Sequence, residues 1–159
     1  MTIPQPSTIL LRGAIAGAAG GLAEITWVAL YAAATGGNAA LLARGVTTAA
    51  GVDALFPAAA VELGVTIHMV LAVLLGIALA YAWRAYVQRG GYARPYAFMS
   101  AALAGVWSLN FFVVLPLLSP VFIGLLPYAV SLSSKLLFGL AAAAVLQGEN
   151  VFTLRARRA

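Results

Sequence analysis

Four long apolar stretches dominate this sequence, and they restrict the chain to folds that a lipid bilayer can solvate. They cover about residues 9–33, 61–83, 97–118 and 121–146. Because a helix rises about 1.5 Å per residue, roughly 20 apolar residues cross the hydrocarbon core of a membrane. Only 8% of the 159 residues are charged, whereas a soluble domain carries about 25%. The sequence therefore predicts an all-α, antiparallel four-helix transmembrane bundle that forms a single domain over residues 1–159.

An N-terminal signal peptide is the alternative interpretation of the first apolar stretch. The small residues Ala14-Ile15-Ala16 resemble a cleavage site. The apolar run is longer than the hydrophobic region of a signal peptide, however, and it contains both Glu24 and Trp27. We therefore expect this stretch to be a membrane span.

The positions of the basic residues predict the orientation of the bundle. Arginines concentrate in the two terminal segments and in the connection after the second span, whereas the connection Ser119-Pro120 has no charge. The positive-inside rule then places both termini and the middle connection in the cytoplasm, as expected for a multi-pass protein of a bacterial inner membrane. We attribute the net charge of +5 to this topology and expect no nucleic-acid partner. The arginines concerned are Arg12, then Arg84, Arg89 and Arg94, then Arg155, Arg157 and Arg158.

The connections between the spans have two further features. Aromatic residues bracket the arginine-rich connection, as an interfacial belt would. The first connection, about residues 34–60, is the only long external one that the pattern predicts, and a short interfacial helix from Asn38 to Arg44 is expected within it. Its length makes it a candidate lid or partner surface. The belt comprises Tyr81, Trp83, Tyr86, Tyr92 and Tyr96.

Small residues repeat at a four-residue spacing within the spans. The first span contains Gly13, Gly17 and Gly21, and such a stripe lets two helix backbones approach closely in a membrane. In the third span Gly105 follows Ala101 at the same spacing, and in the fourth span Gly139 follows Lys135. The spacing predicts that these glycines form helix-packing faces.

One polar residue lies near the middle of each apolar stretch: Glu24, His68, Asn110 and Lys135. On insertion scales a central Asp, Lys or Arg costs at least about 2.5–3.5 kcal/mol, so such groups face a protein interior and have partners. Glu24, His68 and Lys135 fall on the small-residue stripes of their own spans. Asn110 lies about half a turn away from the Ala101/Gly105 face, toward a neighbouring subunit or another polar pocket.

These positions lead to one structural hypothesis and leave two interpretations of it open. We expect Glu24 and Lys135 to form an ion pair in the bundle interior, with His68 near it. As a structural device, the pair would fix the register of the helices. As a functional device, the cluster would be a proton or ligand site, since intramembrane ionisable groups are candidates for such roles.

The residue types also limit the chemistry that is available. The chain has no cysteine, which excludes thiolate catalysis and thiolate metal sites. A single histidine cannot supply both axial ligands of a haem, and we expect no metal and no cofactor. An aromatic pocket for an apolar or cationic ligand is conceivable, although rings of this kind are more commonly interfacial anchors. Its members would be Trp27, Tyr31, Trp107 and Tyr128.

The chain resembles the uncharacterised small four-helix membrane proteins that are common in bacterial genomes. The resemblance rests on Arg12-Gly13-Ala-Ile-Ala-Gly17, Ala23-Glu24-Ile-Thr-Trp27 and Ile67-His68-Met69. It implies an architecture and no particular activity. Small multidrug carriers also have a glutamate in the first of four spans, but they are shorter and have no counterpart of Lys135.

Two functions from different classes follow from these patterns. The first is a non-catalytic membrane subunit or accessory protein, which packs through its glycine stripes as a homo-oligomer or within a larger membrane complex. The second is a small proton-linked carrier or channel, in which Glu24 exchanges a proton or cation, Lys135 tunes it and His68 relays. An enzyme that acts on a lipid or a quinone is a third and weaker hypothesis, because no nucleophile motif or pair of carboxylates occurs.

Overall fold

The computed structural model describes the backbone of residues 6–91 and 94–156, and the side chains of residues 7–91 and 94–147. Within these segments 86% of the residues are helical and no strand occurs, which confirms the predicted all-α class. A bilayer favours this outcome because a helix satisfies its own backbone hydrogen bonds. The elements are α1 (Pro6–Thr35), α2 (Ala39–Ala49), η1 (Pro57–Ala59), α3 (Ala60–Gln88), α4 (Pro95–Leu109), η2 (Asn110–Val114), α5 (Leu115–Leu118), α6 (Pro120–Ile123) and α7 (Tyr128–Ala156).

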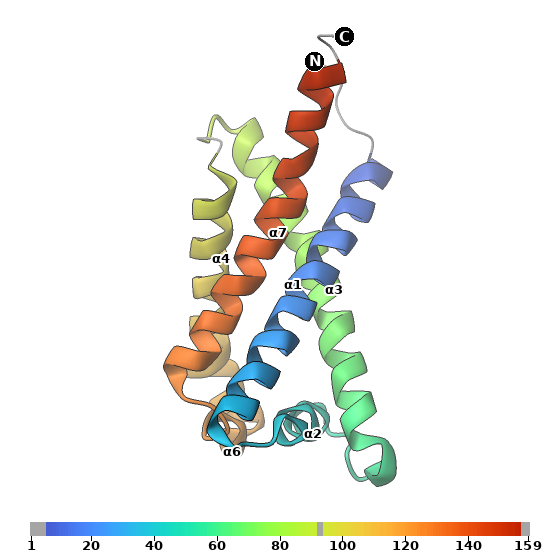
Figure 1. Ribbon diagram of the computed structural model, residues 1–159, viewed down its shortest axis with the longest axis vertical. Helices are drawn as coiled ribbons and strands as arrows, with labels where there is room; N and C mark the ends of the chain where they lie inside the picture. Colours follow the sequence, from blue (N-terminus) through green and yellow to red (C-terminus); the bar gives the residue numbers. More distant parts are fainter. Residues whose placement is uncertain (1–5, 92–93, 157–159) are drawn as a thin grey trace.

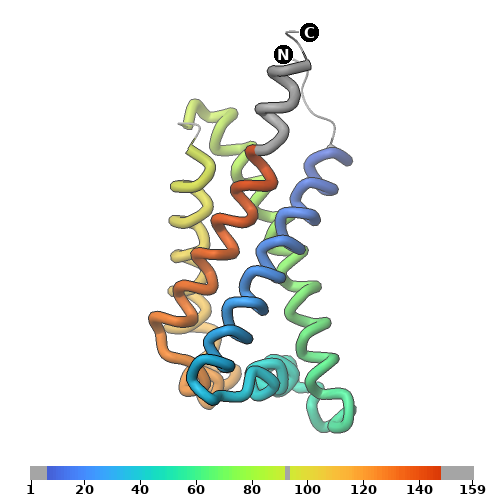
Figure 2. Tube along the Cα trace, viewed as in Figure 1, coloured from blue at the N-terminus to red at the C-terminus, as the bar shows by residue number. Residues whose placement is uncertain are grey.

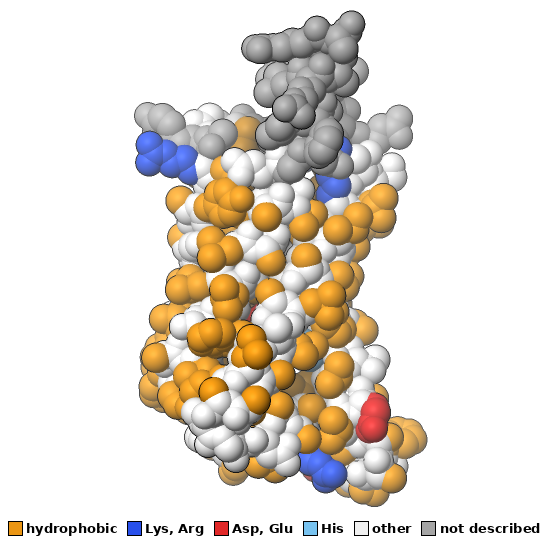
Figure 3. All heavy atoms as spheres, viewed as in Figure 1, with side chains coloured by type: hydrophobic (Ala, Val, Ile, Leu, Met, Phe, Trp, Pro, Cys, Tyr) orange, Lys and Arg blue, Asp and Glu red, His pale blue; other side chains and the backbone are white. Residues whose placement is uncertain are grey.

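Four helical segments are long and apolar enough to cross a membrane, which indicates an integral membrane protein. On the face drawn in Figure 3, hydrophobic side chains cover the flank of the molecule, and the charged side chains that are visible lie mostly near its two ends. Tyr92 and the side chains of Arg155, Arg157 and Arg158 lie outside the described residues. The four segments are Ser7–Thr35, Pro57–Gln88, Pro95–Leu118 and Tyr128–Gln147.

The four long helices do not pack evenly around a central axis. α1 packs along both α3 and α7, and α7 packs along α4. α3 and α4 are consecutive in the chain, yet their backbones come close at few points. Figures 1 and 2 show α2 and α6 lying across the end of the bundle that is remote from the α3–α4 connection. The bundle is therefore tight around α1 and α7 and loose between α3 and α4.

The first connection contains the short helix that the sequence predicts, and this helix is longer than expected. α1 ends at Thr35, where Gly36 takes the left-handed conformation with a φ of 69°. The Asn38 side chain then caps α2 by accepting a hydrogen bond of 2.9 Å from the Ala40 backbone N–H. At the far end of α2, the fully buried Thr47 hydroxyl lies 3.1 Å from the Ala60 carbonyl oxygen. α2 is thus tied to the start of α3.

The start predicted for the fourth span, near residue 121, is wrong. The apolar run continues from Val121, but its first part forms the separate short helix α6, and α7 begins only at Tyr128. Pro127 explains the break, because proline has no N–H and the residue before it disfavours the helical conformation. Hydropathy does not register this interruption, since the residues between the two helices are themselves apolar. The third connection is consequently longer than Ser119-Pro120.

Pro116 interrupts the hydrogen-bond ladder of the third span. Inside a helix a proline ring clashes with the carbonyl four residues earlier. The preceding residues Asn110–Val114 form a wider, π-type turn, a rare feature that accommodates one extra residue. Within this turn Phe111 is 6% exposed whereas Phe112 is 61% exposed. The turn therefore sets which aromatic ring faces the interior of the bundle.

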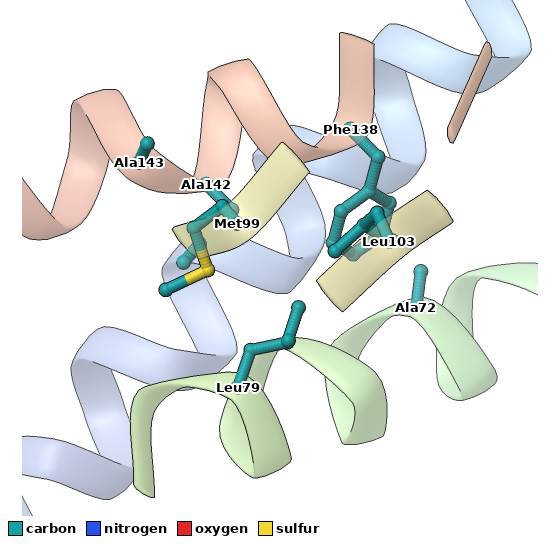
Figure 4. Close-up of a cluster of buried hydrophobic side chains, with 8 residues drawn as sticks. Ala72, Leu79, Met99, Leu103, Phe138, Ala142 and Ala143 are labelled. Atoms are coloured by element: carbon teal, nitrogen blue, oxygen red, sulfur yellow. The ribbon is translucent and has the colours of Figure 1, made fainter. Parts of the chain in front are cut away.

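The hydrophobic core occupies the half of the bundle nearer the α3–α4 connection. Phe138, Met99 and Leu103 are fully buried there, in contact with small residues of neighbouring helices (Figure 4). Gly20 of α1 faces the ring of Phe138, so this ring packs directly against the α1 backbone. This core brings all four long helices together. The other half of the bundle holds a smaller apolar cluster around Trp107, Phe111 and Leu115, together with the polar residues.

The glycines of α1 lie where two backbones meet. A Cβ on Gly17 would overlap the Ala72 carbonyl and the backbone of Val73 in α3. Gly13 meets the α3 backbone one turn away, near Ile77, and Gly21 faces the side chain of Ala72. Such contacts hold helices together in a membrane, where apolarity alone provides no attraction between them.

The two remaining predicted packing glycines behave differently from each other. Gly139 lies against the Met99 backbone, with 3.3 Å between its ideal Cβ position and the Met99 carbonyl oxygen. Gly105 is exposed and has no atom within 4 Å of its Cβ position, so it makes no close helix contact within the described bundle, and its packing role stays a prediction. The physical reason is that α4 packs through Met99, Leu103 and Trp107, and Gly105 lies about half a turn from that face.

Gly17→Ala is expected to destabilise the protein by about 1–3 kcal/mol, because the added methyl group overlaps backbone atoms that cannot move aside. The measurement is the free energy of unfolding in mild detergent titrated with a denaturing detergent, followed by circular dichroism. Gly105→Ala is the matched control and is expected to cause no loss of stability, because its Cβ position is open. Equal effects of the two substitutions would contradict the close approach of α1 and α3.

Candidate functional site

Glu24 of α1 and Lys135 of α7 form the ion pair that the sequence predicts. The Lys135 Nζ atom lies 2.7 Å from Oε1 and 3.0 Å from Oε2 of Glu24. Glu24 is only 4% exposed, so the carboxylate has little access to other partners. Both carboxylate oxygens are therefore engaged by one ammonium group, the arrangement that makes burial of two opposite charges tolerable.

Local sequence explains why these two side chains meet. Gly20 of α1 faces the Phe138 ring of α7. Glu24 follows Gly20 by four residues and Lys135 precedes Phe138 by three, so both lie about one turn along from that contact. The close approach at Gly20 thus sets the register at which the carboxylate and the ammonium group come together.

His68 of α3 lies beside the ion pair without completing it. Its Nε2 atom is 3.6 Å from Glu24 Oε2, which is too long for a hydrogen bond. That nitrogen is buried and has no hydrogen-bond partner. The structure therefore brings together three of the four predicted polar residues, and it leaves one ring nitrogen of His68 available.

Two serines of α7 extend the polar cluster. The Ser134 hydroxyl is 3.5 Å from Glu24 Oε1 and donates a hydrogen bond of 2.7 Å to the Ser131 carbonyl. The Ser131 hydroxyl accepts a hydrogen bond of 3.1 Å from the Trp107 indole. Sequence reasoning missed Ser134. The signal that would have found it is its position beside Lys135 and three residues after Ser131, which places it one turn along α7.

The polar residues line one large cavity in the bundle. Its volume is about 670 Å³, and its walls come from all four long helices and from α2, η2, α5 and α6. The cavity extends from the core residues Ala72 and Phe138 to the inner face of α2. Most of its lining is aliphatic. Its polar lining residues are Glu24, His68, Asn110, Ser131, Ser134 and Lys135.

Asn110 thus joins the same cavity as the other three predicted polar residues. It is half-buried in the π-type turn before Pro116. Among the described residues, no hydrogen-bond partner of its side-chain amide is found. Of the two surroundings that the sequence left open, a polar pocket within the chain is the one observed.

The cavity is bordered by α3 and α4, whose backbones come close at few points. Leu71 of α3 and Leu118 of α5 both belong to its lining, and they are 57% and 66% exposed. Side chains that line a cavity and are also this exposed mark its rim. The cavity therefore opens on the flank of the bundle, where the surface is apolar.

None of the four residues of the predicted aromatic pocket lines this cavity, and the pocket stays a prediction. Trp27 donates a hydrogen bond of 3.1 Å to the Val130 carbonyl, so its ring packs across the α1–α7 interface. Trp107 stacks on Phe111 and meets the ring of Tyr128 edge-on. An indole N–H needs a partner when it is buried, and α7 supplies that partner for both Trp27 and Trp107. Tyr31 takes part in neither contact.

The donor atoms at the cavity suit hydrogen bonding and proton exchange better than metal binding. Glu24 and His68 carry ligand atoms, but no group of three His, Cys, Asp or Glu side chains occurs in the described segments. The chain matches no protein-family model, no curated protein and no solved structure. The residues of the cavity are therefore the best indication of function.

A double-mutant cycle tests the ion pair. Glu24→Gln and Lys135→Met are each expected to cost about 3–5 kcal/mol, because each leaves one buried charge without its partner. The double variant is expected to recover much of that loss. The measurement is the free energy of unfolding of all four proteins, and strictly additive effects would show that the two side chains do not interact.

Proposed function

We propose that this chain is a small proton-linked carrier or channel of the membrane, in which the cavity holds the bound species and the Glu24–His68–Lys135 cluster holds the exchangeable proton. The observation that carries the proposal is the cavity of about 670 Å³ that reaches the cluster. A purely structural pair would be expected in a closed interior with every polar atom satisfied. Here the side chains of Lys135 and His68 are 20% and 26% exposed.

The geometry suggests how the cluster exchanges a proton. Glu24 sits between two nitrogen groups, with Lys135 Nζ at 2.7 Å and His68 Nε2 at 3.6 Å. A proton that arrives through the cavity would reach the His68 side chain before the carboxylate, since the His68 side chain is 26% exposed and that of Glu24 only 5%. A protonated His68 would then compete with Lys135 for the carboxylate. The Glu24 carboxylate would thus pair with either Lys135 or His68. A carrier that couples ligand binding to protonation requires two alternative states of this kind.

The other candidate is a non-catalytic subunit that forms a homo-oligomer or joins a larger membrane complex. One observation favours it. Ala97, Ala101 and Gly105 follow one another at four-residue spacing on an exposed face of α4. Small residues on a membrane-facing helix are typical of helix–helix contacts. In that case the ion pair would only fix register, and the protein would move no proton.

Proton flux separates the two candidates. Reconstituted into liposomes, the protein is expected to dissipate an imposed pH gradient faster than protein-free liposomes do, and Glu24→Gln is expected to return the rate to that background. The rate is measured with an entrapped pH-sensitive dye. Glu62→Gln is the matched control, because Glu62 is exposed in the first turn of α3 and should leave the rate unchanged. A wild-type rate at background would contradict the proposal and favour the subunit.

We further propose an antiparallel bundle in a bacterial inner membrane with both termini in the cytoplasm. Two observations support the orientation. Arg84 lies near the end of α3, Arg89 and Arg94 lie in the connection between α3 and α4, and aromatic rings cluster beside it. The rings of Trp83, Tyr86 and Phe98 have centroids 5.0–5.9 Å apart. Arginines and interfacial rings together are typical of the cytoplasmic boundary.

Cysteine labelling tests the orientation without background, because the natural chain has no cysteine. Ala54→Cys, between α2 and α3, is expected to react with a membrane-impermeant maleimide in intact spheroplasts. Gln88→Cys, at the end of α3, is expected to react only after permeabilisation. Both positions are exposed, so access to the reagent depends on the side of the membrane. The opposite labelling pattern would contradict the proposed orientation.

A further inference from the structure

We propose that the cavity binds an uncharged amphiphile, a molecule with one apolar chain and a hydrogen-bonding but uncharged head group, which enters from the lipid between α3 and α4. The proposal rests on the proposed function and names the substrate class of the same site. It follows from three properties of the cavity: its charge balance, its unused polar atoms and its open side.

The charge balance excludes a charged head group as the preferred ligand. Glu24 and Lys135 neutralise each other through two contacts of 2.7 Å and 3.0 Å. A cationic or anionic ligand would add a charge to a site whose own charges are already paired, and a buried unpaired charge is unfavourable. An uncharged head group avoids this cost.

The unused polar atoms point to a head group that both donates and accepts hydrogen bonds. The Asn110 amide offers two donors and one acceptor, and it makes no hydrogen bond to another described residue. His68 Nε2 is buried and unpaired on the facing helix. Both residues line the same cavity. A hydroxyl, amide or carbonyl group at this end of the cavity would satisfy atoms that are otherwise costly to bury.

The rest of the lining suits an apolar chain. Beyond the polar cluster the walls are aliphatic and include Val61 and Leu75 of α3, Val106 of α4 and Leu42 of α2. The volume of about 670 Å³ falls within the range of about 300–1,000 Å³ that is common for small-molecule sites. Water is poorly held by such walls, since it needs two or more polar partners.

The access route follows from which helices are sealed together. A Cβ on Gly64 would overlap the Ala43 carbonyl, so α2 is in direct backbone contact with α3. Gly45 of α2 faces the Phe122 ring of α6, so these two helices are also in close contact. These contacts join α2 to its neighbours across the end of the bundle (Figure 1). α3 and α4 pack against each other near their connection, where the Trp83 and Tyr86 rings contact Phe98. In the half of the bundle that holds the cavity their backbones stay apart, and Leu71 at the rim faces the region where lipid chains lie.

The test uses four photoreactive probes with the same dodecyl chain: a dodecanol, a dodecanoate, a dodecyltrimethylammonium and a plain dodecane. Each is crosslinked to the wild-type protein in lipid vesicles, and the labelled residues are mapped by mass spectrometry. The dodecanol probe is expected to label cavity-lining residues of α3 and α4 roughly tenfold more than the other three probes do, the factor that one good hydrogen bond supplies. Preference for a charged probe, or for dodecane, would overturn the proposed head group.

Substitutions at the rim and at the polar end complete the test. Leu71→Trp is expected to reduce dodecanol labelling roughly tenfold, because the larger side chain narrows the opening between α3 and α4. Leu74→Trp is the matched control, since Leu74 is 56% exposed on the same helix but does not line the cavity. Equal labelling of the two variants would overturn the lateral route. Asn110→Leu is expected to abolish the preference for dodecanol over dodecane while leaving the dodecane labelling unchanged.

The outcomes distinguish this inference from the proposed function. Proton flux that depends on Glu24, without labelling of the cavity by any dodecyl probe, would overturn the ligand class and leave the carrier or channel intact. Cavity labelling that follows the expected order, without such flux, would support the amphiphile site and contradict proton coupling. Circular dichroism of each variant in the same vesicles shows whether a lost signal reflects loss of fold.

Discussion

The ion pair between Glu24 and Lys135 is the constraint on which the rest of the structure depends. A charge in the middle of a membrane span must face a partner of opposite sign, and these two residues come from the first and last spans of the chain. The contact therefore forces α1 and α7 to be neighbours and fixes how far one is shifted along the other. It also requires that the two backbones be close, which Gly20 allows by admitting the Phe138 ring.

Close packing on one side of the bundle creates the space on the other. The glycines of α1 draw in α3, and the contacts of Phe138 and Gly139 draw together α1, α7 and α4. α3 and α4 each have a tight neighbour of this kind, but their own backbones come close only near the connection between them. Two large aromatic residues, Trp107 of α4 and Phe111 of η2, pack against α7. This packing adds to the separation between α3 and α4. The cavity is thus a consequence of uneven helix distances.

Much of this arrangement was predictable from local patterns. Hydropathy located the four spans, and the coincidence of Glu24, His68 and Lys135 with small-residue stripes predicted that they would meet. What failed were inferences about positions where an apolar run hides a change of structure. The fourth span begins after Pro127 because a proline breaks the helix without changing its hydropathy. Gly105 is left uncovered within the described bundle, because a spacing of four identifies a face and not the neighbour that covers it.

The cavity itself was beyond sequence reasoning, and so was the setting of Asn110. Which face of a helix borders empty space depends on distances between helices, which no single span encodes. The aromatic residues illustrate the same limit. The indole N–H groups of Trp27 and Trp107 find acceptors on α7, so both rings pack toward that helix and not into the cavity. The roles of the polar residues and the orientation of the bundle in the membrane stay predictions.

A count of hydrogen-bonding atoms argues that the polar end of the cavity is built to receive something. The Lys135 ammonium has three donors, and the two Glu24 oxygens engage it on one side. His68 Nε2 and the Asn110 amide add further unpaired capacity from two other helices. A group whose only duty was to hold α1 against α7 would not need polar atoms on α3 and η2. Two segments from opposite sides of one cavity that both place polar side chains in its lining are better explained by a molecule that bridges them.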